Sequence, residues 1–563
     1  MRYVDGDLRD IRLGDHGPEI VRRIYMVFQD RNWTARPWVI TDEQVDARHD
    51  SFDIRISARG TSDAQPFTWQ GELQGRADGR ITSRVHGEAS APFLRNRLGL
   101  CVLHPIRETA GQPAVLEHVD GTIVPTSFPD EIDPGMPFMQ MRALSHEVAP
   151  GLRATVCMTG ETFETEDHRN WSDASYKHYC TPISLPFPVV VEPGDVIEQE
   201  ITLTLSGSES RVAASTSPDE PMTITMSDRE VPMPGLGIQL DTDGHVLSPD
   251  EITRLRALHL DHVRVTVTPL HSPADLERML VQTHAIGAPA VVVLDGADPG
   301  AFMSSHGDLR IREWLAFDAQ VKVADPRRVR FAEQVLGAMV GGGTNLYFTE
   351  LNRARPAASD LMAFSVNPQV HASDDQSVMQ NAMTQGVIAR NARDLYPDSR
   401  LVISPITLRP RFNPNATMPE LAVSSTPLPS RVDARQCLPF AAAWTALSIK
   451  AIAESGCIDA VTYFEATGWE GLMERTGGTP QPKDFASTPG EPFPVYHLLA
   501  ALAGATTVRP CMSSEPDAVD ALIVDGTAFV INATEQAQSV LIAGRTVDLD
   551  PYAIVTIPVG GPA

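Results

Sequence analysis

The sequence lacks any apolar run of the roughly 20 residues that a membrane-spanning helix requires. It is also poor in positive charge, since 46 lysines and arginines stand against 72 aspartates and glutamates, giving a net charge of −26. That balance argues against a nucleic-acid partner, which needs a basic surface, and against binding to anionic membranes. Residues 1–7 contain no apolar segment, so we expect neither a signal peptide nor a membrane location.

Paired cysteines are missing as well. Six cysteines are scattered along the chain and none forms a CxxC pair, so neither a zinc knuckle nor a thioredoxin-type motif is predicted. The six are Cys101, Cys157, Cys180, Cys437, Cys457 and Cys511. A long chain without a signal peptide is expected to keep such thiols reduced, in the cytoplasm.

Several catalytic motifs are absent from the chain. It has no G-x-S-x-G elbow, which argues against a serine hydrolase of the α/β type. It has no H-E-x-x-H, and no H-x-H pair closes the first predicted barrel strand. The 16 histidines are scattered, so the sequence predicts neither a metal nor a cofactor.

The sequence does contain three segments of different rhythm, as expected for a chain of 563 residues. Residues 1–232 show short alternating strands and Asp-Gly turns, which predict a large antiparallel β-sandwich. Residues 233–506 alternate apolar strands with amphipathic helices, which predicts a (β/α)₈ TIM barrel. Residues 507–563 are β again and predict a small sandwich. The expected fold class is therefore multidomain, α/β plus all-β.

Eight strands are predicted for the barrel. They fall at 236–240, 263–267, 290–294, 320–323, 346–350, 361–366, 401–403 and 460–464. Helices are expected after Ser248, which has Pro249 and Glu251 in a capping-box pattern, and at 273–286, 326–339, 376–395, 440–455 and 495–503. A doubly wound open sheet is the rival architecture, but no GxGxxG follows the first strand.

Two glutamates end predicted strands of this barrel. Glu350 ends the fifth strand and Glu465 ends the eighth. Barrel enzymes build their active sites at the C-terminal ends of strands. Two carboxyl groups in one cleft can act as acid and base when their environments separate their pKa values. We therefore predict that both glutamates are catalytic; the structural alternative for Glu350 is an ion pair with Arg353.

Polar residues on the same loops are predicted to assist them. Asn352 and Arg353 would orient Glu350 or hold an oxygen-rich substrate. Asn367 and His371 follow the sixth strand, and His371 could donate a proton or stabilise an oxyanion. A loop histidine without a catalytic role is the alternative.

Two further loops offer substrate contacts. Arg409 or Arg411 could bind a carboxylate product or polarise a carbonyl, unless this is a solvent-exposed basic loop. Trp469 could stack on a sugar ring or simply pack, and Glu470 is expected to be more exposed than Glu465.

The densest polar stretch lies in the first segment, at residues 161–177. It mixes acids, bases and aromatic residues, and Arg169, Asn170 and Lys177 are candidates to reach the substrate. An internal cluster of salt bridges is the structural alternative.

Four stretches of the chain are long and unusual. They are residues 3–9 (YVDGDLR), 96–105 (NRLGLCVLHP), 166–177 (EDHRNWSDASYK) and 348–353 (FTELNR). Together they resemble the D-apionate lactonase family, and the similarity extends along the chain. The resemblance implies the same plan of sandwich, barrel and small β domain, and hydrolysis of D-apionolactone to D-apionate in a bacterial sugar catabolic pathway. It assigns no catalytic residues.

The sequence therefore predicts a sugar lactone hydrolase with a small-molecule substrate, and leaves a homo-oligomer open. Lactone opening needs an activated water, a stabilised carbonyl oxygen and a protonated leaving alkoxide. Glu350 or Glu465 would be the base, the other glutamate or His371 the proton donor, and Arg353 or His371 the oxyanion partner.

Two alternatives remain. One is a retaining glycosidase with the two glutamates roughly 5 Å apart, although their positions on the fifth and eighth strands weigh against it. The other is a non-catalytic carbohydrate-binding protein.

Overall fold

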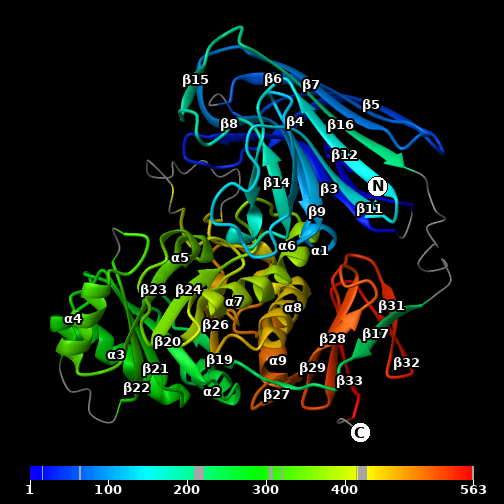
Figure 1. Ribbon diagram of the computed structural model, residues 1–563. Helices are drawn as coiled ribbons and strands as arrows, with labels where there is room; N and C mark the ends of the chain where they lie inside the picture. Colours follow the sequence, from blue (N-terminus) through cyan, green and yellow to red (C-terminus); the bar gives the residue numbers. More distant parts are fainter. Residues whose placement is uncertain are drawn as a thin grey trace. The chain divides into compact units, whose positions relative to one another are not determined.

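The computed structural model describes residues 1–14, 17–62, 65–207, 221–303, 309–318, 321–413, 415 and 428–560 (Figure 1). The chain forms two compact units. The first comprises Met1–His168, Ala174–Glu220 and Asn415–Leu421, and the second comprises Arg169–Asp173, Pro221–Pro414 and Ala422–Ala563. The short segment Arg169–Asp173 therefore belongs to the second unit, although the residues on both sides of it belong to the first.

The first unit is a β-sandwich of two antiparallel sheets. One sheet contains β1 (Arg2–Val4), β2 (Asp7–Arg12), β3 (Glu19–Asp30), β8 (Phe93–Pro105), β13 (Glu164–Asp167), β14 (Ser175–Tyr179) and β15 (Val189–Val191). The other contains β4 (Trp38–Ala47), β5 (Phe52–Gly60), β6 (Phe67–Gly75), β7 (Ile81–Ala89), β9 (Pro113–His118), β10 (Ile123–Ser127), β11 (Met141–Ala149), β12 (Leu152–Thr159) and β16 (Val196–Gly207). The short helix α1 (Ile106–Thr109) follows β8.

Alternating side chains build the core of this sandwich. Along β6, Phe67, Trp69 and Leu73 are buried while the residues between them are mostly exposed, the period of two that a half-buried strand requires. One core cluster joins residues of both sheets, such as Leu100 of β8 and Val156 of β12. The predicted large β-sandwich is confirmed.

A closed barrel of eight parallel strands forms the centre of the second unit (Figure 1). Its strands are β19 (Gly235–Gln239), β20 (His262–Val267), β21 (Ala290–Asp295), β22 (Ile311–Phe317), β23 (Val340–Tyr347), β24 (Leu361–Val366), β25 (Arg400–Ile406) and β26 (Ala460–Glu465). β26 pairs in parallel with β19 and closes the ring. The predicted TIM barrel is confirmed.

Helices alternate with most of these strands. They are α2 (Pro249–Ala257), α3 (Pro273–Ile286), α4 (Pro326–Leu336), α5 (Phe348–Ala354), α6 (Asp375–Ala382), α7 (Thr384–Leu395), α8 (Pro439–Ser455) and α9 (Pro494–Ala501). The capping box predicted at Ser248 is present, because the Ser248 hydroxyl accepts from the Glu251 amide and the Glu251 carboxylate accepts from the Ser248 amide. The helix predicted at 376–395 is divided at Met383 into α6 and α7.

The predicted fourth strand at 320–323 is wrong. β22 occupies Ile311–Phe317, and residues 321–323 form a bend, while Gln320 lies outside the described residues. β22 was missed in the sequence because charged residues lie near its start. Arg312 pairs with Asp261 at 2.5 Å, and Glu313 pairs with Arg400 at 2.6 Å. Their pairing allows a strand that does not look apolar.

The prediction that Glu350 ends the fifth strand is also wrong. β23 ends at Tyr347, and Glu350 lies in the first turn of α5. The start of β23 was missed in the sequence because it contains three glycines, at 341–343, and glycine is depleted in strands. Leu351, Arg353 and Ala354 favour a helix, and a carboxylate in the first turn suits the positive end of the helix dipole.

The C-terminal sandwich is built from both ends of the second unit. It contains β27 (Thr507–Arg509), β28 (Cys511–Ser513), β29 (Val519–Val524), β30 (Thr527–Asn532), β31 (Gln538–Ile542), β32 (Arg545–Leu549) and β33 (Ile554–Pro558). Two strands that precede the barrel join it: β17 (Met222–Met226) pairs with β28 and β31, and β18 (Val231–Pro232) pairs with β27. The domain limits at 232 and 506 remain predictions.

Helix α8 lies between the barrel and this sandwich, and it contacts α7, α9 and β29. Nearly all of its side chains are buried, which explains why its sequence is apolar on every side rather than amphipathic. Among the described residues, no helix combines the length and the apolar character that crossing a bilayer would require.

Candidate functional site

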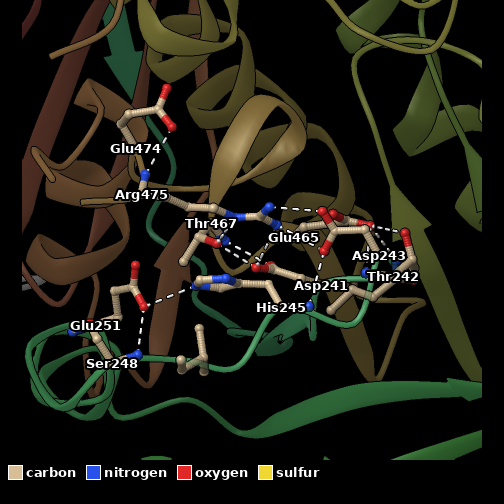
Figure 2. A network of polar contacts seen from close by, with 12 residues as sticks. Asp241, Thr242, Asp243, His245, Ser248, Glu251, Glu465, Thr467, Glu474 and Arg475 are labelled. Carbon is tan, nitrogen blue, oxygen red and sulfur yellow. Dashed lines mark hydrogen bonds and ion pairs between the residues drawn. The ribbon is translucent and has the colours of Figure 1, made fainter. Parts of the chain in front are cut away.

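Glu465 is the last residue of β26, where the eighth strand meets the first (Figure 2). Its carboxylate accepts a hydrogen bond from the Thr242 hydroxyl at 2.6 Å and weaker ones from the Thr242 amide and the Gln239 side chain, both at 3.3 Å. Gln239 and Glu465 are register partners in the closing strand pair. Closure of the barrel therefore fixes the position of this carboxyl group.

The surroundings of Glu465 suit proton transfer. Burial, together with the nearby Glu470 and Asp241 carboxylates, raises the pKa of Glu465 to about 7, although the Thr242 hydroxyl opposes the shift. A carboxyl group that titrates near neutral pH can both accept and return a proton at that pH.

A second polar cluster, which the sequence analysis missed, lies beside Glu465 (Figure 2). Asp241 is buried just after β19 and accepts hydrogen bonds from the Thr467 amide and hydroxyl. Arg475 pairs with Asp241 at 3.1 Å and with Asp243 at 2.7 Å. Asp241 follows the predicted first strand directly, so the rule that selected Glu465 could also have selected it.

The same cluster bears on metal binding. Carboxylates such as Asp241 and Asp243 are hard-cation ligands in many sites. Here the Arg475 guanidinium already pairs with both of them, so it supplies the positive charge that a cation would otherwise bring.

Arg411 lies at the barrel mouth beside β23. It donates to the backbone oxygen of Asn345 and, at 3.2 Å, to the Asn345 side-chain oxygen. Burial lowers the pKa of Arg411, while Tyr347, Asp295, Glu470 and Glu465 raise it. Glu465 is therefore one of several acidic groups whose charge favours the protonated form of Arg411.

Glu350 has different surroundings. It is buried, and its carboxylate pairs with the Lys322 ammonium at 2.8 Å. It does not pair with Arg353, whose guanidinium instead lies 5.4 Å from the centre of the Trp171 ring. In the described part of the chain, Glu350 and Glu465 share no hydrogen-bond partner, so their joint action remains a prediction.

Several predicted residues meet the segment Arg169–Asp173. The Asn352 amide donates to Asn170 at 3.0 Å. His371 Nδ1 pairs with Asp173 at 2.7 Å, and the His371 and Trp171 rings meet in a T-shaped arrangement with 6.1 Å between their centres. The Asp173 carboxylate therefore holds the His371 ring in one orientation.

The other predicted residues lie in varied places. Asn367 is buried after β24 and accepts from the Gln369 amide. Arg409 pairs with Asp433 at 3.4 Å, so it is not the freely exposed arginine of the structural alternative. Trp469 is half-buried and donates to the Thr479 hydroxyl at 2.7 Å.

Two candidates from the polar stretch of the first segment fall in different units. Arg169 is buried in the second unit. Lys177 is buried on β14 in the first unit, with its ammonium 5.5 Å from the centre of the Tyr179 ring. Glu470 is not exposed as expected: only 13% of its side-chain surface is accessible, and it pairs with Arg431 at 2.6 Å.

Comparison with known proteins is consistent with this architecture. Residues 1–208 match the D-apionate lactonase N-terminal domain family, and residues 323–507 match the D-apionate lactonase TIM barrel domain family. The D-apionate lactonase of Brucella anthropi is 31% identical over 586 aligned positions, covering 98% of this chain and 94% of that protein.

Two solved structures show a remote likeness. A GH30 endoxylanase from Clostridium papyrosolvens C71 is 10% identical, with a TM-score of 0.37 over 60% of this chain and 97% of that chain. A GH51 arabinofuranosidase from Xanthomonas axonopodis pv. citri is 13% identical, with a TM-score of 0.37 over 60% of this chain and 93% of that chain. By its full-length relative and its two matched domains, the chain belongs to the D-apionate lactonase family, and it is a lactone hydrolase.

Proposed function

We propose that this protein hydrolyses D-apionolactone to D-apionate, with Glu465 as the general base. The substrate is suggested by the name of the Brucella anthropi relative. The observation that carries the catalytic role is the position of Glu465 at the C-terminal end of β26, with a pKa near 7 and a fixed orientation.

The proposed reaction starts with a water molecule attacking the lactone carbonyl. Glu465 takes a proton from the water as the new C–O bond forms, and the carbonyl oxygen becomes an oxyanion. The bond from the carbonyl carbon to the ring oxygen then breaks. Glu465 returns its proton to the departing ring oxygen, so that lactone and water give one hydroxy acid.

The residues around Arg169–Asp173 are proposed to hold the sugar hydroxyls. Asn352, Arg353 and His371 converge on this segment and provide donors and acceptors on one rim of the barrel. Glu350 already has an ammonium partner in Lys322, so we propose that it orders this rim rather than moving protons. Trp469, Asn367 and Arg409 are proposed to shape the rest of the pocket.

The test is to measure acid release from D-apionolactone by the purified protein and by a Glu465→Gln variant. Loss of the base should lower kcat by about 10²- to 10⁴-fold. In the wild type, kcat/KM should fall about tenfold per pH unit below pH 7, because the base must be deprotonated. Glu277→Gln is the matched control, since Glu277 is exposed on α3.

Three outcomes would contradict the proposal. One is full activity of Glu465→Gln. Another is release of the aryl group from aryl glycosides with no acid release from the lactone, which would favour a glycosidase. The third is loss of lactone hydrolysis on adding a chelator, which would show that the water is activated by a metal rather than by Glu465 alone.

A further inference from the structure

Two arginines at the barrel interior share one asparagine. Arg264 of β20 is 0% exposed and donates to the Ser404 carbonyl at 2.8 Å, to the Ser404 hydroxyl at 3.0 Å and to the Asn345 side-chain oxygen at 2.8 Å. Arg411 donates to the same side-chain oxygen and to the Asn345 carbonyl. The side-chain oxygen of Asn345, on β23, is therefore a hydrogen-bond acceptor shared by the two guanidinium groups.

This arrangement concentrates positive charge where no acid neutralises it directly. In the part of the chain that the structure describes, neither Arg264 nor Arg411 is bonded to a carboxylate. Burial lowers the pKa of Arg264, and the charge of Arg411 lowers it further. Two cations, one fully buried and one partly buried, that share a neutral amide oxygen are costly unless an anion binds beside them.

The two arginines also decide which way the Asn345 amide faces. Guanidinium N–H groups can only donate, so the Asn345 atom that meets both of them must be the oxygen. The amide nitrogen then points away from the arginines. In the described residues this nitrogen has no hydrogen-bond partner, although Asn345 as a whole is only 8% exposed.

Hydrogen bonds connect the residues behind this amide to the strand that carries the proposed base. The Ser404 hydroxyl that accepts from Arg264 bonds the Thr462 hydroxyl at 2.8 Å, and Thr462 lies on β26, the strand that Glu465 ends. Thr462 in turn bonds His262 at 2.8 Å. Fixed donors of this kind stabilise developing charge better than mobile water does, because they need no reorganisation.

We propose that the Asn345 amide nitrogen and the Arg411 guanidinium form the oxyanion site of the lactonase. They would donate hydrogen bonds to the carbonyl oxygen as water attacks, while Arg264 acts as a positioning residue that holds the amide. This inference rests on the proposed function, since it assigns a role in lactone opening. Glu465 is among the groups that act electrostatically on Arg411, as expected if base and oxyanion site serve one pocket.

The discriminating variant is Asn345→Asp. An aspartate keeps the shape and accepts hydrogen bonds from both arginines, so a purely structural role would be preserved or strengthened. It lacks the N–H donor and places a negative charge beside the oxyanion. We expect kcat to fall by about 10²- to 10³-fold with a smaller change in KM, and the melting temperature to stay equal or rise.

Controls separate the two proposals. Asn391→Asp is the matched control, because Asn391 on α7 donates to a carbonyl of its own helix. If the wild type does not open D-apionolactone, the proposed function fails. If the wild type is active and folded Asn345→Asp keeps its kcat within about threefold, the oxyanion assignment alone fails.

A second variant covers the case in which Asn345→Asp does not fold. Arg411→Lys keeps the positive charge but loses the planar fork of donors. We expect its kcat to fall at least about tenfold, because lysine loses one of the hydrogen bonds that the guanidinium can donate to the oxyanion. An unchanged kcat for Arg411→Lys would overturn the assignment.

Discussion

At the scale of single residues, Glu465 couples folding to pH. Its pKa is about 7 in the folded chain and would be near 4.5 in an unfolded one. Between these values the folded state binds more protons, so the free energy of unfolding falls as pH rises towards 7. A carboxyl group with a raised pKa, useful for catalysis, therefore weakens the fold at neutral and alkaline pH.

Replacing this group by a neutral amide should remove that penalty. At pH 8 we expect the free energy of unfolding of Glu465→Gln to exceed that of the wild type by roughly 2–3 kcal/mol. At pH 4.5 the two proteins should differ little. Urea unfolding at the two pH values measures the difference. A difference of the same size at both pH values would show that the effect is packing rather than ionisation.

The sequence could identify Glu465 because an acid directly after an apolar strand is a local signal. It offered Arg411 only as one of two candidate arginines on the loop after the seventh strand, and it could not identify Asn345. Asn345 lies inside β23, where a polar residue carries no signal of its own, and its orientation depends on Arg264, 81 positions earlier. Such sites are made by barrel closure, which brings distant strands together.

At the scale of elements, β23 depends on its glycines. Gly343 has a φ of +99°, which side chains disfavour, and an added Cβ would collide with the Ala363 carbonyl of β24. A Cβ on Gly342 would meet Val329 at 3.3 Å, a tight contact that side-chain movement can relieve. The two neighbouring positions should therefore respond differently to the same substitution.

We expect Gly343→Ala to destabilise the protein by about 2–4 kcal/mol, through backbone strain and loss of strand pairing. Gly342→Ala should cost about 1 kcal/mol or less. Thermal unfolding of both variants measures the contrast. Equal costs would mean that β23 can shift against β24, which the close packing of these strands argues against.

The elements that were easy to predict carry their own start signals. α3 begins at Pro273 after a Ser272 cap and ends at Ile286 before Gly287, and its predicted limits are correct. The predicted positions of β22 and β23 were wrong. Their charged residues and glycines do not look like strand residues until the neighbouring strands provide ion-pair partners and close backbone contacts. Local chemistry predicts helix ends, whereas strand positions in a barrel depend on partners.

At the scale of the whole molecule, a buried ammonium helps join the barrel to the C-terminal sandwich within the second unit. Lys450 of α8 pairs with Glu454 at 2.9 Å and with Asp520 of β29 at 3.4 Å, and it donates to the Cys511 carbonyl at 3.1 Å. The side chains of Lys450 and Asp520 are 3% and 1% exposed. Burying these charges is tolerated because each has an oppositely charged partner.

Removing one partner should therefore be worse than removing both. We expect Lys450→Met to lower the free energy of unfolding by about 3–5 kcal/mol, because it leaves buried carboxylates without their cation. Adding Asp520→Asn to this variant should recover part of the loss. Lys483→Met, at an exposed position, is the control and should change stability by no more than about 0.5 kcal/mol. If Lys450→Met were as stable as Lys483→Met, or if Asp520→Asn gave no recovery, the sandwich would be held to α8 by apolar packing alone.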